Sequence, residues 1–207
     1  MNNELIIIGY SGHSYVCIEI AKATDINITG YCDLEMKKYN PYNLNYLGNE
    51  KEGRFDKNYF ITIANNKIRR NIFYSLPIEC LKTKLIHAKS VISETAKIGI
   101  QTIVGSAAII NAQAQIGRSC IINSGAIIEH ECVISDFVHI APGASLLGAV
   151  EIGEKSFIGS NAIIKPGVKI NRNVIIGAGS VVLDNIPDKG TYVGIPAKKI
   201  KWNKKVF

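Results

Sequence analysis

A repeat of six residues, unbroken from Val91 to Ile186, constrains this chain more than any other feature. The second residue of every six is aliphatic, and four residues later comes a small or β-branched residue, with Ile186 as the exception. A helix repeats every 3.6 residues and a strand every two, so neither keeps a period of six on one face. Three short strands per turn of a parallel β-helix do give this period. The aliphatic positions are Ile92, Ile98, Val104, Ile110, Ile116, Ile122, Ile128, Ile134, Ile140, Leu146, Ile152, Ile158, Ile164, Ile170, Ile176 and Val182.

Glycine or asparagine often follows the aliphatic residue, as at Gly99, Gly117, Asn123 and Gly153. A prism with three short sides must turn sharply between strands. Gly and Asn tolerate positive φ better than other residues do. We therefore expect these residues to supply the positive φ of the corners.

The first third of the chain has a different pattern. A buried strand over 4–8 is followed by the glycine-containing turn 9–14 and by apolar residues at helical spacing over 15–23. Such a strand, turn and helix can hold an anion at the helix N-terminus. The full GxGxxG motif is missing, so we expect no nicotinamide cofactor. A second strand, 28–32, ends at Asp33, a position from which an acidic residue often binds a ribose hydroxyl.

A polar, turn-rich stretch, 35–57, leads to a third strand over 59–64 and a helix with Asn66 as its N-cap. A further strand begins at Leu85. The expected fold is a small N-terminal Rossmann-like parallel α/β domain followed by a left-handed parallel β-helix of hexapeptide repeats. The expected parts are 1–85 for nucleotide-sugar binding, 86–186 for the β-helix acyltransferase domain, and 187–207 as a C-terminal capping segment.

The formal net charge is +7, and many of the positive charges lie near the C-terminus. Three interpretations remain open: a nucleic-acid surface, a site for the phosphates of a small cofactor, and a solvated tail. No nucleic-acid motif accompanies the lysines, so we expect no nucleic-acid partner. The lysines are Lys189, Lys198, Lys199, Lys201, Lys204 and Lys205.

No apolar run is long enough to span a membrane, and the first ten residues lack the features of a signal peptide. The five cysteines form no CxxC pair, which favours a reduced protein. We therefore expect a cytoplasmic protein without membrane insertion.

One hexapeptide breaks the structural pattern, because Glu129, His130 and Glu131 occupy its outward positions. An imidazole beside a carboxylate can act as a general base near neutral pH. The alternative is a surface pair without a function. A zinc site is not expected, since the repeat region has only His87, His130 and His139 and shows no three-ligand set. A covalent acyl-enzyme is not indicated either, because no Gly-x-Ser-x-Gly motif is present.

The whole chain resembles the hexapeptide-repeat acyltransferases that modify nucleotide-linked amino sugars. The resemblance is strongest to the UDP-4-amino-sugar N-acetyltransferases of the bacillosamine pathway, and it extends to perosamine N-acetyltransferases and sialic acid O-acetyltransferases. The motifs are Gly9-Tyr10-Ser11-Gly12-His13, Asp33, Asn65-Asn66 with Arg69, the segment 128–134, His139 and the segment 193–198.

The resemblance implies a homotrimer with three interfacial sites, in which acetyl-CoA donates its acetyl group directly to the C4 amine of a nucleotide-linked 4-amino-4,6-dideoxy sugar. O-acetylation of a sialic-acid-type sugar and a non-catalytic scaffold remain alternatives. The nucleotide (UDP, dTDP or GDP) stays open, and the glycan pathway served is expected to be surface glycan synthesis. No metal is expected. The implied residues are His130 and Glu131 as general base and its partner; Gly9, Ser11, Gly12, His13, Asp33, Asn65 and Asn123 for the nucleotide sugar; and His139, Gly148, Ser160, Ala178 and Lys198 for CoA, with a backbone N–H near Gly148 for the oxyanion.

Overall fold

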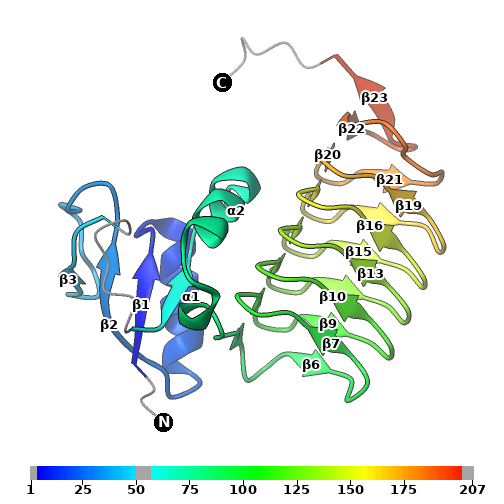
Figure 1. Ribbon diagram of the computed structural model, residues 1–207. Coiled ribbons are helices and arrows are strands. Elements are labelled where there is room, and N and C mark those ends of the chain that lie inside the picture. Colours follow the sequence, from blue (N-terminus) through cyan, green and yellow to red (C-terminus); the bar gives the residue numbers. More distant parts are fainter. Residues whose placement is uncertain (1–3, 50–56, 202–207) are drawn as a thin grey trace.

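The computed structural model describes residues 4–49 and 57–201. An N-terminal sheet and a long triangular prism lie side by side, with the second helix between the sheet and the upper coils (Figure 1). Lys204 and Lys205, the last lysines of the basic C-terminal region, lie outside the described residues.

The N-terminal sheet is parallel, with the strand order β3-β2-β1-β4. Its centre is β1, whose alternating residues are buried on both faces, as expected for a parallel sheet between two layers. The bounds are Glu4–Ile8 for β1, Asn27–Cys32 for β2, Asn45–Tyr46 for β3 and Tyr59–Ile61 for β4.

The two helices pack on opposite faces of this sheet. Helix α1 (Gly12–Lys22) packs through Cys17 and Ile20 against the face that carries Leu5. Helix α2 (Asn66–Ser75) packs through Phe73 against the face that carries Ile6 and Ile8. A short 3-10 helix, η2 (Ile78–Cys80), follows α2 and leads to the prism.

The prism has three faces, and each is a sheet of short parallel strands, with the antiparallel β23 added at one end of the long face. Each complete coil contributes one strand of two or three residues to each face. The long face contains β5 (Leu85–Ile86), β8 (Ile103–Val104), β11 (Ile121–Ile122), β14 (His139–Ile140), β17 (Phe157–Ile158), β20 (Val174–Ile176), β22 (Gly190–Val193) and β23 (Lys198–Ile200). The apolar face contains β6 (Val91–Ile92), β9 (Ile109–Ile110), β12 (Ile127–Ile128), β15 (Ser145–Leu146), β18 (Ile163–Ile164) and β21 (Val181–Val182). The polar face contains β7 (Lys97–Ile98), β10 (Gln115–Ile116), β13 (Val133–Ile134), β16 (Glu151–Ile152) and β19 (Lys169–Ile170).

The inward residue of each strand is the aliphatic residue that the repeat predicts. Ile122 pairs in register with Val104 below it and Ile140 above it, eighteen residues away in each direction. Ala126 and Cys132 fill the narrow corners and are fully buried. The parallel β-helix and its inward positions are therefore confirmed.

The prediction that the glycine or asparagine after each aliphatic residue supplies the positive φ of the corner is wrong. The residue with positive φ comes two places after the glycine or asparagine, and it is usually not glycine, as at Gln101 (58°), Glu131 (60°) and Lys155 (60°). Gly99 and Gly153 are needed for another reason, since a Cβ there would lie 2.5 Å from backbone atoms of the next coil. These glycines permit close stacking of coils rather than an unusual φ.

The N-terminal part packs against the lower coils through α1. Cys17 and Ile20 of α1 share a buried cluster with Ile103 and Ile121, the outward residues of β8 and β11. At the other end, β23 pairs antiparallel with β22 and extends the long face. The upper half of the long face, from β14 upward, lies beside α2, whose Asn66 donates to the carbonyl of Lys155.

Most of the expected N-terminal elements are present, with shifted boundaries. The first helix begins at Gly12 rather than at 15, and the third strand ends at Ile61 rather than at 64. The N-cap of α2 is Asn65, not Asn66, because the Asn65 side chain accepts hydrogen bonds from the N–H groups of Lys67 and Ile68.

Candidate active site

His130 lies at the tip of the corner between β12 and β13, which we call the His130 corner (129–132). Its Nδ1 lies 3.1 Å from Oε2 of Glu131. Both side chains are exposed in the single chain. When Nδ1–H donates to the carboxylate, Nε2 keeps its lone pair and is available to take a proton. This geometry suits a general base whose other ring nitrogen is hydrogen-bonded to a carboxylate.

Gly148 occupies the same corner position one coil above His130. A Cβ at Gly148 would lie 2.5 Å from Cε1 and 2.6 Å from Nε2 of His130, so the imidazole rests against a residue without a side chain. Among the hydrogen bonds of the described residues, none is donated by the N–H of Gly148. That N–H can therefore donate to a group held beside Nε2 of His130.

A separate pocket of about 410 Å³ lies at the C-terminal ends of the N-terminal strands. Gly9, Ser11 and Asp33, three of the residues predicted to bind the nucleotide sugar, line it. Gly9 has a φ of 91°. Asp33 accepts hydrogen bonds from the N–H of Tyr10 (2.9 Å) and of Leu34 (2.7 Å). We call this hollow the nucleotide pocket, after the ligand that the sequence predicts for Gly9, Ser11 and Asp33. Its walls also include Ile8, Tyr10, Leu34, Lys37, Ile63, Ile68, Asn71 and Ile72.

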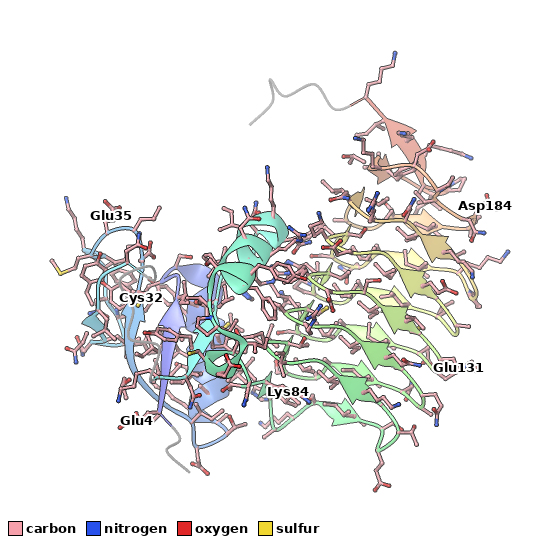
Figure 2. All side chains as sticks on the ribbon, viewed as in Figure 1. Glu4, Cys32, Glu35, Lys84, Glu131 and Asp184 are labelled. Atoms are coloured by element: carbon pink, nitrogen blue, oxygen red, sulfur yellow. The ribbon has the colours of Figure 1, made fainter. Side chains whose placement is uncertain are left out.

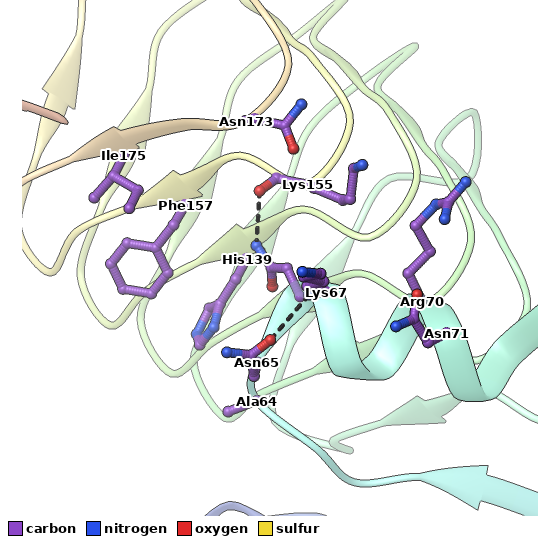
Figure 3. A pocket seen from close by; sticks show the side chains of 11 residues that line it. Ala64, Asn65, Lys67, Arg70, Asn71, His139, Lys155, Phe157, Asn173 and Ile175 are labelled. Atoms are coloured by element: carbon purple, nitrogen blue, oxygen red, sulfur yellow. Dashed lines mark hydrogen bonds between the residues drawn. The ribbon is translucent and has the colours of Figure 1, made fainter. Parts of the chain in front are cut away.

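A larger cleft of about 760 Å³ lies between α2 and the upper half of the long face, and we call it the seam cleft. Figure 3 shows Asn65 and Lys67 at the start of α2 facing His139 and Phe157 from the prism. The cleft combines basic and amide groups with an apolar floor. Its lining residues are Ala64, Asn65, Asn66, Lys67, Arg70, Asn71, His139, Lys155, Phe157, Asn173 and Ile175.

Two histidines meet at the bottom of the seam. The ring centroids of His13, from α1, and His139, from β14, are 6.4 Å apart. Burial, and then the positive charge of Arg69, lowers the pKa of His139 to about 3. The same two causes, in the same order, lower the pKa of His13 to about 4. Both imidazoles are therefore neutral at pH 7 and can accept as well as donate a hydrogen bond.

The predicted CoA residues separate into three places. Ser160 and Ala178 occupy equivalent positions one coil apart on the edge where the long face meets the apolar face, which we call the Ser160 edge. Asn123, which was predicted to bind the nucleotide sugar and not CoA, lies lower on this edge, where its Oδ1 accepts from the N–H of Ser124. Lys198, in β23, lies above the edge, because the N–H of neighbouring Ala197 donates to the carbonyl of Val181.

The other two predicted CoA residues are elsewhere in the chain. His139 lies on the long face within the seam cleft, and Gly148 lies beside His130. Figure 2 shows Glu131 on the margin of the prism farthest from the N-terminal sheet, where Glu4 and Glu35 are labelled. The His130 corner and the pocket at the ends of the N-terminal strands therefore lie on opposite sides of the chain.

Several residues at these sites were not assigned a role from the sequence. Lys37 forms an ion pair with Asp33 in the nucleotide pocket (3.2 Å). Lys67, Lys155 and Phe157 line the seam cleft. Their meeting depends on contacts between segments about ninety residues apart, for which a single sequence has no signal. One signal was available in the sequence: His139, Phe157 and Ile175 occupy the same outward position in three successive coils, so they must lie one above another on the same face.

Within residues 4–49 and 57–201, no three His, Cys, Asp or Glu side chains come together as metal ligands. All five cysteines are buried, and none of them forms a disulfide bond. None of the helices in these same ranges has the length and apolar character to span a membrane.

Two family models match the chain, the PglD N-terminal domain over residues 4–76 and the bacterial transferase hexapeptide over residues 149–184. The chain is 34% identical over 153 residues to GDP-perosamine N-acetyltransferase of Escherichia coli O157:H7, covering 70% of this chain and 69% of that protein.

Two solved structures superpose on nearly the whole chain. One is the acetyltransferase domain of PglB from Neisseria gonorrhoeae in complex with acetyl coenzyme A, with 30% identity, a TM-score of 0.89, and coverage of 97% of this chain and 100% of that one. The other is a histidine-to-asparagine variant of perosamine N-acetyltransferase from Caulobacter crescentus in complex with CoA and GDP-perosamine. It has 29% identity, a TM-score of 0.89, and coverage of 96% of this chain and 97% of that one.

Proposed function

This chain belongs to the hexapeptide-repeat sugar acetyltransferases, and from that premise we propose that it transfers the acetyl group of acetyl-CoA to the C4 amine of a nucleotide-linked 4-amino-4,6-dideoxy sugar. The observation that carries the proposal is the His130 corner, where a carboxylate contacts one imidazole nitrogen and the other nitrogen lies against Gly148, whose N–H donates none of the hydrogen bonds of the described residues. This arrangement suits the attack of an amine on a thioester.

The reaction needs one proton to move and one oxyanion to be stabilised. His130 Nε2 takes a proton from the attacking amine as the new C–N bond forms. The N–H of Gly148 donates to the oxyanion of the tetrahedral intermediate. The C–S bond then breaks, and protonated His130 returns the proton to the departing CoA thiolate. The products are an amide and free CoA.

The remaining predicted residues divide between the two substrates. We assign the nucleotide to the pocket lined by Gly9, Ser11 and Asp33, and its sugar to the neighbouring seam around His13 and Asn65. We assign CoA to the Ser160 edge, with Ala178 above Ser160 and Lys198 near the phosphates. This assignment leads the thioester toward His139 at the base of the seam cleft.

An active site of this kind requires two chains, because one chain holds its general base and its nucleotide pocket on opposite sides. The apolar face supplies a surface for assembly: its outward residues include Ile109, Ile127 and Ile163, and Ile163 is 43% exposed. The polar face carries Lys97, Glu151 and Lys169 at the equivalent positions. We propose a homotrimer with the apolar faces inside, in which the His130 corner of one chain meets the seam cleft of the next.

The test is a purified-enzyme assay with acetyl-CoA and a panel of acceptors, read by release of the CoA thiol. The panel contains GDP-perosamine, a UDP-linked 4-amino sugar, a dTDP-linked 4-amino sugar and sialic acid. Turnover is expected only with the 4-amino sugars. Turnover with sialic acid alone would replace the proposal by sugar O-acetylation.

The same assay on His130→Ala tests the mechanism. Loss of a general base lowers kcat by about 10²- to 10⁴-fold. His87→Ala is the matched control, because His87 lies at the first coil and its Nδ1 accepts from the N–H of Lys89. Wild-type kcat in His130→Ala would exclude His130 as the base.

A further inference from the structure

Arg69 is a buried cation whose hydrogen-bonding capacity is fully used. It is 1% exposed and donates from all five of its N–H groups to acceptors in both parts of the chain. The acceptors are the carbonyls of Ser119 (2.8 Å), Ile63 (3.1 Å), Ala64 (2.9 Å) and Phe137 (3.1 Å), and Oδ1 of Asn66 (2.8 Å).

No carboxylate neutralises Arg69 within residues 4–49 and 57–201, since none of the ion pairs there includes it. Burial lowers its pKa to about 10, so it remains charged at neutral pH. Buried charges are normally paired, because removing an ion from water is costly. Arg69 thus holds an uncompensated positive charge beneath the seam cleft.

Arg69 holds two backbone carbonyls close to His139. The carbonyl of Ala64, which lines the seam cleft together with His139, accepts from Nη1 of Arg69, and the carbonyl of Phe137, two residues before His139, accepts from Nη2. Nε2 of His139 is buried and has no partner. In the Nδ1–H tautomer this nitrogen carries a lone pair and can accept a hydrogen bond. His139 lines the seam cleft and is only 8% exposed.

We infer that Arg69 is a positioning residue: by holding the carbonyls of Ala64 and Phe137, and by its buried charge, it keeps Nε2 of His139 as a hydrogen-bond acceptor for a ligand in the seam cleft. The ligand group is an O–H or N–H donor. It comes from the acceptor sugar or from the amide-containing arm of CoA, an identification that depends on the proposed function. A buried acceptor left without a donor is unfavourable, and a bound donor removes that penalty.

The charged surroundings of His139 agree with this role. Six titratable groups pack around the two histidines and the cleft. They are Lys67, Arg69 and Arg70 from α2, Cys17 from α1, and Glu154 and Lys155 from the corner before β17. Glu154, the one carboxylate among them, is already bonded to Arg70 at 2.9 Å. A proton on Nε2 of His139 would therefore add a charge to a site that is already positive.

The experiment is NMR of the full chain with ¹⁵N-labelled histidine, of which the sequence has four. The ring nitrogen shifts of His139 report both tautomer and charge as the pH is lowered from 8. In the wild type we expect the Nδ1–H tautomer and no protonation down to about pH 5. Arg69→Gln removes the charge, and the pKa of His139 should rise by about one unit without reaching 6.5, because burial persists. Arg69→Lys keeps the charge and should leave that pKa low.

Arg172→Gln is the control, since Arg172 is exposed in the corner before β20 and its substitution changes the net charge equally. It should leave His139 unchanged. CoA and a nucleotide-linked 4-amino sugar are then added separately. The ligand that changes the ¹⁵N chemical shift of Nε2 in His139 is the one that supplies the hydrogen-bond donor. A wild-type Nε2–H tautomer, a His139 pKa near 6.5, or an unchanged pKa in folded Arg69→Gln would overturn the inference.

If Arg69→Gln does not fold, the wild-type tautomer and the Arg69→Lys titration decide between the same outcomes. If neither CoA nor the nucleotide-linked sugar changes the chemical shift of Nε2 in His139, this result would also count against the inference. These readouts do not require turnover. An enzyme inactive on every 4-amino sugar would contradict the proposed function while leaving the role of Arg69 to be judged from the His139 titration.

Discussion

At the scale of single residues, the missing side chain of Gly148 gives the imidazole of His130 its place. We expect Gly148→Ala to displace the ring, because the new Cβ would lie 2.5 Å from Cε1. Misplacement of a catalytic group by about 1 Å can reduce the rate about 100-fold, so we expect a loss of that order in kcat. The measurement is steady-state kinetics with acetyl-CoA.

Thermal unfolding of the same variant is the control. The φ of Gly148 is not positive, and the nearest atoms belong to the exposed His130 side chain, so the melting temperature should be nearly unchanged. Wild-type kcat in a folded Gly148→Ala protein would show that the ring can move aside without consequence.

The sequence predicts His130 because polar residues interrupt an otherwise structural repeat. It does not predict the state of His139, whose pKa depends on burial and on Arg69, a residue seventy positions away. The sequence of α2, which contains Arg69, is otherwise typical of an amphipathic helix, so an arginine in it is expected to be exposed. Its burial follows from acceptors at Ser119 and Phe137, which only the folded chain brings near.

At the scale of elements, the two residues of each prism strand face opposite ways, and β13 allows a matched comparison. Ile134 points inward and is 2% exposed, whereas Val133 points outward and is 42% exposed. Ile134→Ala should lower the free energy of unfolding by about 2–5 kcal/mol, since it leaves a cavity in a close-packed stack. Val133→Ala should lower it by less than about 1 kcal/mol.

Urea unfolding at one fixed chain concentration measures both values, because assembly makes apparent stability concentration-dependent. Equal losses from the two variants would contradict the inward and outward assignment.

The period of six is enough to predict which residue of each strand faces inward, because only one position per six is always aliphatic. It does not determine the dihedral angles of the corners. Gly99 and Gln101 show the difference: stacking of coils requires the glycine, while the glutamine adopts a φ of 58°. Helix boundaries were similarly underdetermined, since both Asn65 and Asn66 can cap a helix.

At the scale of the whole molecule, two faces of the prism differ in the residues they expose. Ile163 on the apolar face and Val133 on the polar face are 43% and 42% exposed, so they form a matched pair. We expect Ile163→Lys to dissociate the assembly, since a charge would be buried between apolar faces. Val133→Lys should leave it intact. Sedimentation velocity distinguishes the outcomes, and dissociation by Val133→Lys alone would place the interface on the polar face.

The strongest consequence of the proposed active site shared between chains is that two inactive variants should restore activity together. His130→Ala lacks the proposed base, and Ile68→Trp fills the pocket that Ile68 lines. Each variant alone should be inactive. In mixed assemblies, a site is intact when one chain supplies His130 and the next supplies the pocket. In a cyclic trimer that contains both variants, about one third of the sites meet this condition.

Co-expression with two different affinity tags, followed by sequential purification, isolates the mixed assemblies, and release of the CoA thiol measures their turnover. Assemblies of each variant purified in the same way provide the baseline. Recovery of activity is possible only if His130 and the nucleotide pocket of a working site come from different chains. Mixed assemblies as inactive as their parents would instead require both groups to act within one chain, which the distance across the prism opposes.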